Sequence, residues 1–409
     1  MHELQDMLSL ALRARSRGEQ LYLATVVHVE GSSYRKPGAR MLVTSGGERA
    51  GTISGGCLEA EVSRKIAWLT SEGGRVERYR SSLEDDYLEV PYGLGCGGTI
   101  WVLMETGQAV VAVLDAMQRA WAGANPCIVV ALLGGDQIGT ALIVEAATGQ
   151  ELFRSTAVHD WSSTTSESPV DSIALRDGRV FSAVERSSDG LPVLVCMPMK
   201  PTPGVTVFGA GNDAQPLVRF ASEVGWRVTV ADGRNHLLTR ARFPEADALQ
   251  LLTYAGSESS SEKGLVVTNG SALKKSRFGV ILTHSYEQDR ALLRELLPAK
   301  LEYLGILGPL HRTERLVNAV AYSLGMTPSE CLRQLHAPVG LNFGSDDPAV
   351  IALSIISEMQ AAVSGTRGLL ERRYDRRPPV EVGQSNLRSY DRRTEARANN
   401  NDIKGVRVP

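Results

Sequence analysis

The chain has 409 residues, 43% of them apolar and 22% charged, and its 46 acidic side chains nearly balance its 44 basic ones. These values are ordinary for a globular protein of two or three domains, and they exclude fibrous and low-complexity chains. No run approaches the ~20 apolar residues of a membrane helix. The first residues also lack the basic and apolar regions of a signal peptide, so we expect a cytoplasmic protein.

Glycine and cysteine are the most informative residue types. The 40 glycines exceed the usual ~7% of residues and follow no repeat, which indicates tight turns and loops that come close to a ligand. The five cysteines are few and odd in number, so no disulfide framework is expected. The sequence contains no C-x-x-C or H-E-x-x-H motif, so nothing in it supports a standard zinc site.

The first 199 residues predict a mixture of helices and strands. Apolar spacing indicates helices over 4–16, over 58–69 and near 109–121. Runs rich in β-forming residues predict strands at 21–29, 40–44, 51–54, 99–104, 127–133, 140–144 and 191–196.

The pattern changes after the linker Lys200–Gly204, which holds two prolines. Strands and helices then alternate, which favours a parallel sheet wrapped by helices. We predict strands at 205–208, 227–231, 280–283 and 303–307, and helices at 214–224, 289–297 and 348–363, the last capped by Ser345 or Asp346. The predicted fold is α/β: an N-terminal mixed α/β domain over 1–199 and a Rossmann-like, doubly wound parallel-sheet domain over 200–365.

The last segment, 366–409, is basic, with 11 Lys or Arg against 6 Asp or Glu. A basic tail is able to contact nucleic acid, but here acidic residues are interspersed with the basic ones. We therefore expect a solvated flexible tail and no nucleic-acid partner.

Residues 205–214 read V-T-V-F-G-A-G-N-D-A, a dinucleotide-type turn between a strand and a helix. In such a turn Gly209 makes the bend and Gly211 lets the backbone approach a pyrophosphate, which the helix N-terminus then attracts. Asp232 follows the next strand at the distance expected of a ribose-binding carboxylate. Asp213 opposes this interpretation, because its charge repels a pyrophosphate unless the side chain points away. The alternative is that the turn is scaffold and Asp232 caps a turn.

Two glycine-rich loops of the first half carry cysteines. Cys57 follows Gly55 and Gly56 at a predicted helix N-terminus, a position that lowers the pKa of a thiol. Cys96 precedes Gly97 and Gly98 at the entry to a strand. Glycine adds nothing to core packing, so we interpret both thiols as ligand contacts rather than small buried apolar side chains. The other cysteines, 127, 196 and 331, are expected to be structural.

Cations cluster in a third loop, at 31–40. Arg35, Lys36 and Arg40 have the charge to bind an anion such as a phosphate. An ordinary solvated turn explains the same residues. Similarly, His284 follows a predicted strand at the edge where ligands bind in parallel sheets, or it is a structural histidine.

Eight segments, in order along the chain, resemble the XdhC/CoxI family of accessory factors, which take part in the maturation of molybdenum hydroxylases such as xanthine dehydrogenase. They are G-S-S-Y-R-K-P-G-A-R-M-L-V-T (31–44), G-T-I-S-G-G-C-L-E-A-E-V (51–62), G-L-G-C-G-G-T-I (93–100), V-T-V-F-G-A-G-N-D-A (205–214), R-V-T-V-A-D-G-R (227–234), T-H-S-Y-E-Q-D (283–289), Y-L-G-I-L-G (303–308) and H-A-P-V-G-L-N-F-G (336–344). The family usually has an acid directly after His284, where this chain has Ser285. It also usually has S-x-R/K after the Y-L-G-I-L-G segment, so a basic contact there rests on Arg312.

The resemblance implies a protein that binds molybdenum cofactor (molybdopterin) and helps its sulfuration together with a cysteine desulfurase. Such a protein delivers the cofactor to an apo molybdenum hydroxylase, is commonly a homodimer, and has no turnover or catalytic residue of its own. The candidate cofactor-binding residues are Arg35, Arg40, Gly55, Gly56, Cys57, Cys96, Gly97, Gly98, Gly209, Gly211, Asp232 and His284, with Cys57 and Cys96 as candidate molybdenum contacts. Molybdenum is thiophilic, so soft thiolates suit it.

Two other functions fit the residues. The dinucleotide-type turn with Asp232 fits an NAD(P)-dependent oxidoreductase, with NAD favoured because a carboxylate repels the 2′-phosphate of NADP. An interaction scaffold that pairs a hydroxylase with a sulfur donor would need neither thiol.

Overall fold

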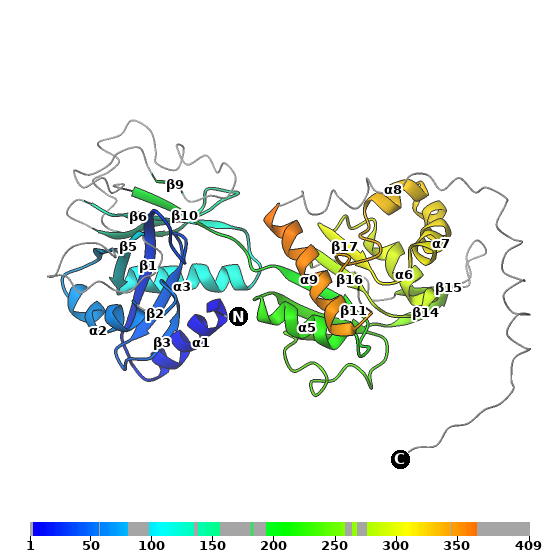
Figure 1. Ribbon diagram of the computed structural model, residues 1–409, viewed down its shortest axis with the longest axis horizontal. Coiled ribbons are helices and arrows are strands. Elements are labelled where there is room, and N and C mark those ends of the chain that lie inside the picture. Colours follow the sequence, from blue (N-terminus) through cyan, green and yellow to red (C-terminus); the bar gives the residue numbers. More distant parts are fainter. Residues whose placement is uncertain are drawn as a thin grey trace, which may run out of the picture. The chain divides into compact units, whose positions relative to one another are not determined.

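The structure is a computed structural model of the chain (Figure 1). It describes residues 3–56, 58–80, 98–134, 138–155, 181–182, 194–257, 264–267, 276–344 and 346–365. Met1–Met359 form one compact unit, and the described residues beyond it are the end of the last helix. Within the described ranges, no helix combines the length and the apolar character needed to cross a membrane.

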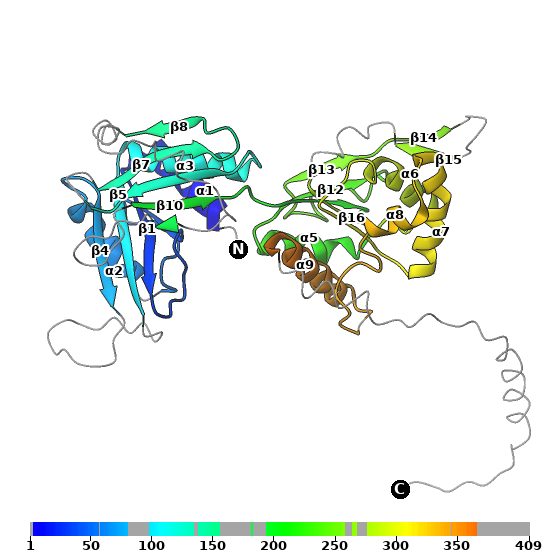
Figure 2. The same ribbon diagram turned by 90° about the horizontal axis from the view of Figure 1, so that it is seen from above.

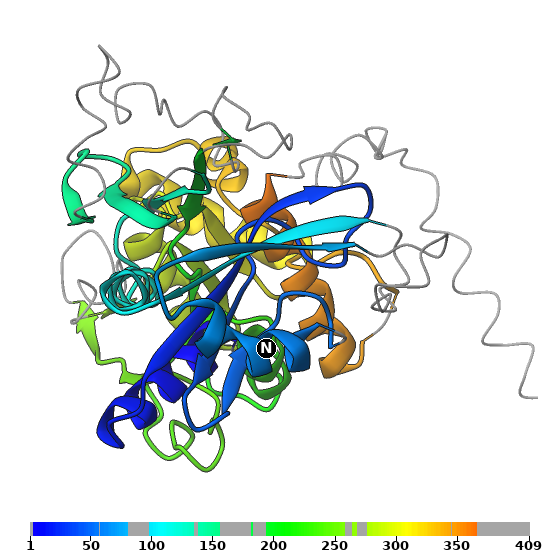
Figure 3. The same ribbon diagram turned by 90° about the vertical axis from the view of Figure 1, so that its left-hand side faces the viewer.

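An antiparallel sheet forms first. Its strand order is β3 (Arg49–Gly51), β2 (Arg40–Thr44), β1 (Leu21–Glu30), β5 (Thr99–Thr106) and β4 (Arg75–Arg80). A second antiparallel sheet follows in the order β8 (Glu151–Arg154), β7 (Gly139–Glu145), β6 (Cys127–Leu132), β10 (Leu194–Met199) and β9 (Phe181–Ser182). Three helices accompany these sheets: α1 (Glu3–Ser16), α2 (Glu59–Leu69) and α3 (Gln108–Trp121), the last seen nearly along its axis in Figure 3.

Strand β1 is apolar on both faces because both are covered. Side chains alternate between the two faces of a strand. Leu21 and Leu23 therefore join the core that contains α1, α3 and one face of the second sheet. Tyr22 and Ala24 point the other way, into a core closed by Val62 and other residues of α2.

The second half contains a parallel sheet. Its order is β13 (Ala248–Leu251), β12 (Arg227–Asp232), β11 (Gly204–Phe208), β16 (Phe278–Ile281) and β17 (Tyr303–Ile306). The chain leaves β11 through α5 (Ala214–Glu223) in one direction and β16 through α6 (Tyr286–Leu296) in the other. Right-handed crossovers then place these helices on opposite faces, as Figure 2 shows. The doubly wound parallel sheet predicted from the sequence is confirmed, and its topological switch point lies between β11 and β16.

Further elements complete this half. They are α7 (Leu310–Ala321), a 3₁₀ turn at Tyr322–Leu324, α8 (Pro328–Arg333), α9 (Pro348–Ser364) and a hairpin of β14 (Tyr254–Ser257) with β15 (Gly264–Val267). Helices α6, α7 and α8 enclose one core with the apolar side chains of Phe208, Ile281 and Leu304.

Three predicted boundaries or caps differ from the structure. The strand predicted over 51–54 ends at Gly51, because the next residues turn around the carboxylate of Glu59. Helix α6 begins three residues early, where the Ser285 hydroxyl caps it. Helix α9 is capped by Asp347, whose Oδ1 accepts from the Ala349 N–H at 2.8 Å, rather than by Asp346. Ser345 lies outside the described residues.

Candidate functional site

Three loops of the first half meet at one end of the first sheet. Gly98, at the entry to β5, lies so close to the loop after β1 that a Cβ there would clash with the Ser32 carbonyl oxygen and stand 2.9 Å from that of Glu30. Gly55 faces the ring of Tyr34, 3.0 Å from where its Cβ would be. The loop at 31–39 therefore touches both of the glycine-rich loops that the sequence singled out.

The two predicted thiols stand next to this junction in sequence. Cys57 lies outside the described residues, as do Cys96 and Gly97. Their described neighbours Gly56 and Gly98 belong to loops that both contact residues 32–34. Their roles as cofactor and molybdenum contacts stay predictions.

The carboxylate of Glu59 fills the turn at 53–56. Its Oε1 accepts the N–H groups of Ile53, Ser54 and Gly55 at 3.0, 2.9 and 3.1 Å. Its Oε2 accepts the Gly56 N–H at 2.9 Å and the Ser54 hydroxyl at 2.6 Å. Gly55 and Gly56 have φ of +107° and +124°, which point their N–H groups inward and which only glycine adopts readily.

This carboxylate is buried and ionised. Burial works to raise the pKa of Glu59, but the hydroxyl and the backbone donors outweigh it and hold the pKa at about 2. A ring of N–H groups around an anion is the arrangement by which glycine loops bind phosphate. Here the anion belongs to the chain, so these N–H groups are already occupied.

The three predicted cations of the loop at 31–40 have different environments. Arg35 donates to the Glu3 carboxylate of α1 at 2.6 Å. Arg40 is half-buried and donates to the Gly38 carbonyl at 3.2 Å. Burial lowers its pKa to about 10, although the buried carboxylate of Glu105 acts to raise it. Lys36 and Tyr34 are exposed. Of these three cations, Lys36 is the one that faces solvent.

The dinucleotide-type turn follows β11 at the switch point. Gly209 has a φ of +125°, and a Cβ there would clash with the Leu282 carbonyl oxygen at the end of β16. Gly209 is therefore required by the close approach of two strand ends, whatever ligand is present. Ala214 begins α5 and is fully buried, as close packing of helix and sheet requires.

Asp232, predicted to bind a ribose, accepts hydrogen bonds from Ala210 and Arg234 of the chain itself. Its Oδ2 accepts the Ala210 N–H at 2.6 Å, and Arg234 donates to it from its backbone and its guanidinium at 2.7 to 3.0 Å. The side chain is 2% exposed. Burial acts to raise the pKa of Asp232, but the Arg234 and Ala210 donors outweigh it and lower the pKa. The carboxylate thus ties the glycine turn to the end of β12.

His284 and Asp213 meet across the turn. His284 Nε2 lies 2.7 Å from Asp213 Oδ2. His284 has a φ of +59°, a conformation uncommon outside glycine and costing about 1 kcal/mol or more. Asp213 Oδ1 lies 2.6 Å from the position a Cβ on Gly211 would take. The Asp213 side chain therefore points into the turn rather than away from it.

Asp289 and Arg312 form a buried ion pair beside this turn, and the sequence analysis did not predict that they meet. Asp289 of α6 accepts from Arg312 of α7 at 2.7 Å and from the Thr283 hydroxyl. Burial raises the pKa of Asp289 despite these donors. Arg312, the basic contact singled out in the sequence, is thus held by Asp289, the last residue of the T-H-S-Y-E-Q-D segment.

A further buried carboxylate fixes the segment at 336–344. Glu358 of α9 accepts from the Tyr303 hydroxyl at 2.7 Å and the Gly340 N–H at 2.7 Å, and lies 3.2 Å from His336 Nδ1. The His336 ring also stacks on Tyr303, with centroids 4.1 Å apart. The H-A-P-V-G segment could have indicated this histidine, but its partner lies 22 residues farther along the chain.

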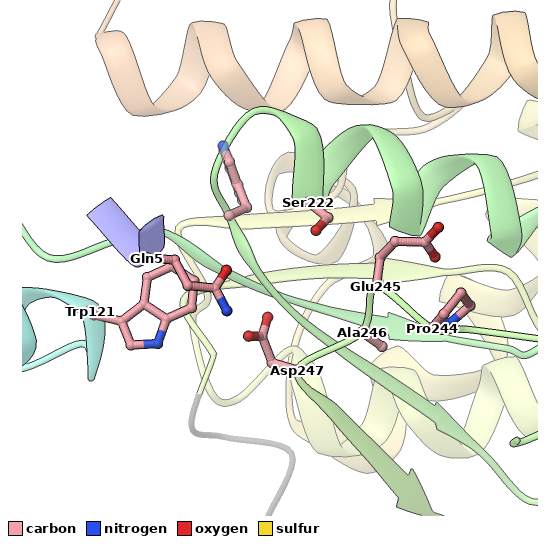
Figure 4. A pocket seen from close by; sticks show the side chains of 8 residues that line it. Gln5, Trp121, Ser222, Pro244, Glu245, Ala246 and Asp247 are labelled. Atoms are coloured by element: carbon pink, nitrogen blue, oxygen red, sulfur yellow. The ribbon is translucent and has the colours of Figure 1, made fainter. Parts of the chain in front are cut away.

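The side chains of Ser222, Glu245 and Asp247 border a pocket at the other end of the parallel sheet (Figure 4). Asp247 accepts the Val228 N–H at 2.7 Å, near the amino end of β12. Ligands of open α/β sheets bind at the carboxyl ends of the strands, so this pocket is not the candidate site. Among the residues that the structure describes, no group of three or more His, Cys, Asp or Glu side chains is placed to hold a metal ion.

Known proteins resemble this chain over both halves. Residues 205–359 match the family described as the XdhC Rossmann domain, and residues 14–80 match the XdhC and CoxI family. A probable xanthine dehydrogenase subunit of Bacillus subtilis (strain 168) is 30% identical over 83% of this chain and 92% of its own length. The molybdenum cofactor insertion chaperone PaoD of Escherichia coli (strain K12) is 24% identical over 87% of each chain.

The same likeness is seen in a solved structure. The crystal structure of a xanthine dehydrogenase from Bacillus halodurans superposes with a TM-score of 0.64, at 27% identity, over 91% of this chain and 98% of that one. The resemblance thus extends along both sheet-containing halves. The chain belongs to the XdhC/CoxI family.

Proposed function

We propose that this protein is a maturation chaperone that binds molybdenum cofactor, assists its sulfuration together with a cysteine desulfurase, and delivers it to an apo-hydroxylase of the xanthine dehydrogenase type. Family membership supports a role in the maturation of such enzymes. The likeness to PaoD, a molybdenum cofactor insertion chaperone, extends over 87% of both chains and supports cofactor binding in particular.

The observation that carries the proposal is the junction of the three loops around residues 32–34. The described neighbours of Cys57 and Cys96 belong to loops that both contact this short segment. Soft thiolates suit a molybdenum centre that is held temporarily and then released, and both thiols are within two residues in sequence of glycines in these loops.

The turn at 53–56 is not available to bind the phosphate of the cofactor. The N–H groups of that turn are bound to Glu59, and Arg35 is bound to Glu3. We propose that the two thiols hold the cofactor and that the exposed Tyr34 and Lys36 of this junction contact it as well. When bound, the cofactor would supply the thiophilic metal, and residues of this chain would hold the cofactor in place.

The proposed compartment is the cytoplasm and the proposed assembly a homodimer. The described cysteines, 127, 196 and 331, are free thiols, which a reducing compartment maintains. The homodimer follows from the family resemblance, and size-exclusion chromatography with light scattering tests it.

The experiment is purification of the full chain from a molybdate-fed host, with the retained ligand identified by absorbance and mass spectrometry. We expect wild type to retain the pterin and to activate an apo-hydroxylase. Cys57→Ala and Cys96→Ala should each lose most of the bound cofactor, whereas the control Cys331→Ala should keep it, because Cys331 is buried in the core of the second half. Retention of the cofactor by the Cys57→Ala/Cys96→Ala double variant would contradict the proposal.

The scaffold hypothesis makes a separate prediction for the same variants. A scaffold would still form its complex with the hydroxylase and still support activation after both thiols are lost. For the oxidoreductase hypothesis, no described contact favours nicotinamide binding, since Asp232 is bound by Arg234 and by the turn itself.

A further inference from the structure

The loops at the carboxyl ends of the parallel strands have the glycine turn of a dinucleotide site. Unlike such a site, they place a carboxylate where the pyrophosphate would bind. In a dinucleotide-binding turn, the pyrophosphate lies against the second glycine and receives N–H groups from the helix N-terminus. The second glycine here is Gly211, and the Asp213 carboxylate reaches within 2.6 Å of the position that a Cβ on Gly211 would take. The position that a pyrophosphate would occupy therefore faces a negative charge of the chain.

His284 holds Asp213 in that position. It lies after β16, on the other side of the switch point from the turn, and its ring nitrogen contacts Asp213 at 2.7 Å. The link joins two residues that are 71 positions apart in sequence, one after β11 and one after β16, at the switch point where α/β proteins bind ligands. His284 has an uncommon backbone conformation, at φ +59°, and its ring nitrogen Nε2 points to the Asp213 carboxylate.

A second carboxylate removes a donor from the turn. The Ala210 N–H, which a phosphate could otherwise bind, donates to Asp232 at 2.6 Å. Two arginines lie nearby, but their contacts are made within the protein. Arg234 binds Asp232, and Arg242 donates to the Ala210 carbonyl at 3.1 Å and to Asn212 Oδ1 at 3.0 Å.

We propose that Asp213, held by His284, is a specificity-determining residue that closes this Rossmann-type turn to phosphate-bearing dinucleotides. The turn has the fold and the glycines of a dinucleotide site, but the Asp213 carboxylate occupies the position where a pyrophosphate would bind. The proposal concerns the second half alone and goes beyond the proposed chaperone function, which depends on thiols of the first half.

The test measures binding of inorganic pyrophosphate, and separately of NAD⁺, to the full chain by isothermal titration calorimetry at constant ionic strength. We expect wild type to show no saturable binding. Asp213→Ser removes the charge and keeps a residue that is favoured at a helix N-cap, so pyrophosphate should bind at least about tenfold more tightly. His284→Ala should give a smaller gain, because it releases Asp213 but leaves its charge.

The matched control is Glu245→Gln, which removes one exposed carboxylate at the opposite edge of the same sheet (Figure 4). It should leave pyrophosphate binding at the wild-type level. Asp213→Asn serves as a second variant should Asp213→Ser fail to fold. The proposal is overturned if wild type binds pyrophosphate or NAD⁺ as tightly as the folded Asp213 variants, or if these variants bind no better than wild type. Retention of molybdenum cofactor by the same proteins is an independent measurement, so failure here leaves the chaperone proposal standing.

Discussion

Glu59 and Asp232 share a role at the residue scale. Each is a buried carboxylate that accepts backbone N–H groups from a glycine turn, and in each case the donors lower its pKa against the effect of burial. A glycine turn with several inward N–H groups needs an anion, because buried donors without a partner cost about 1–3 kcal/mol each. In both turns that anion is part of the chain, so glycine spacing alone did not indicate a phosphate site.

Glu59→Gln tests this role through the pH dependence of stability. The folded pKa of about 2, against an ordinary 4.5, corresponds to about 3 kcal/mol of stabilisation at neutral pH. Because the folded pKa is the lower one, this stabilisation is present above pH 4.5 and is lost as the pH falls towards 2. By pH 4 wild type should have lost about 1 kcal/mol of it. Urea unfolding at pH 7 and pH 4 should therefore show a smaller difference between wild type and variant at pH 4.

The control is Glu72→Gln, since Glu72 is an exposed carboxylate just beyond the end of α2. It should change the free energy of unfolding by less than about 0.5 kcal/mol at both pH values. A difference between wild type and Glu59→Gln that is equal at pH 7 and pH 4 would show that the carboxylate charge is not what the turn requires.

At the scale of elements, the spacing of apolar residues predicted the positions of most helices and strands that depend on local sequence. Apolar periodicity placed α1, α3 and the predicted strands and helices of the second half within a few residues of their observed bounds, whereas β13, α7 and α8 were not predicted. The glycine motifs also marked Gly209 as a tight bend and Gly98 as part of a loop that comes close to a ligand. The role of Glu59 in the 53–56 turn could have been inferred too, because an acid in the first turn of a predicted helix is favoured next to the N–H groups at the helix N-terminus.

Contacts distant in sequence were not predictable in this way. Asp213 meets His284 71 residues later, and nothing in the local sequence decides whether the aspartate points into or out of its turn. Arg40 lies in a cationic loop, yet it is half-buried, it donates to the Gly38 carbonyl, and the charge of the buried Glu105 acts to raise its pKa. The sign and position of charges in a site depend on which loops the fold brings together, and a single sequence does not specify that.

Gly98→Ala tests the junction of the loops. A Cβ there would clash with the Ser32 carbonyl and press on that of Glu30, so the entry to β5 or the loop after β1 must move. We expect a loss of about 2–4 kcal/mol in the free energy of unfolding, measured by urea denaturation. Gly134→Ala is the matched control, because a Cβ at Gly134 meets no atom within 4 Å. Equal stability of the two variants would mean that the close approach at Gly98 is absent in solution.

At the scale of the whole molecule, each of four apolar clusters of described residues lies within one half of the chain. Three clusters draw their residues from positions 7–199, around the two antiparallel sheets. A fourth draws its buried residues from 208–335, on one face of the parallel sheet. A domain is a segment with its own core, so we propose that the chain divides near residue 200, where the sequence places a linker with two prolines.

A fragment of residues 200–365 should therefore fold without the first half. Its parallel sheet has helices on both faces, and its buried carboxylates Asp232, Asp289 and Glu358 all bind partners within the fragment. We expect the fragment to show a cooperative thermal transition by circular dichroism and dispersed amide resonances by NMR. Cofactor should not co-purify with it, because both candidate thiols belong to the first half. A fragment that is unfolded alone, but that folds when residues 1–199 are added, would show that the two halves form one cooperative unit despite their separate cores.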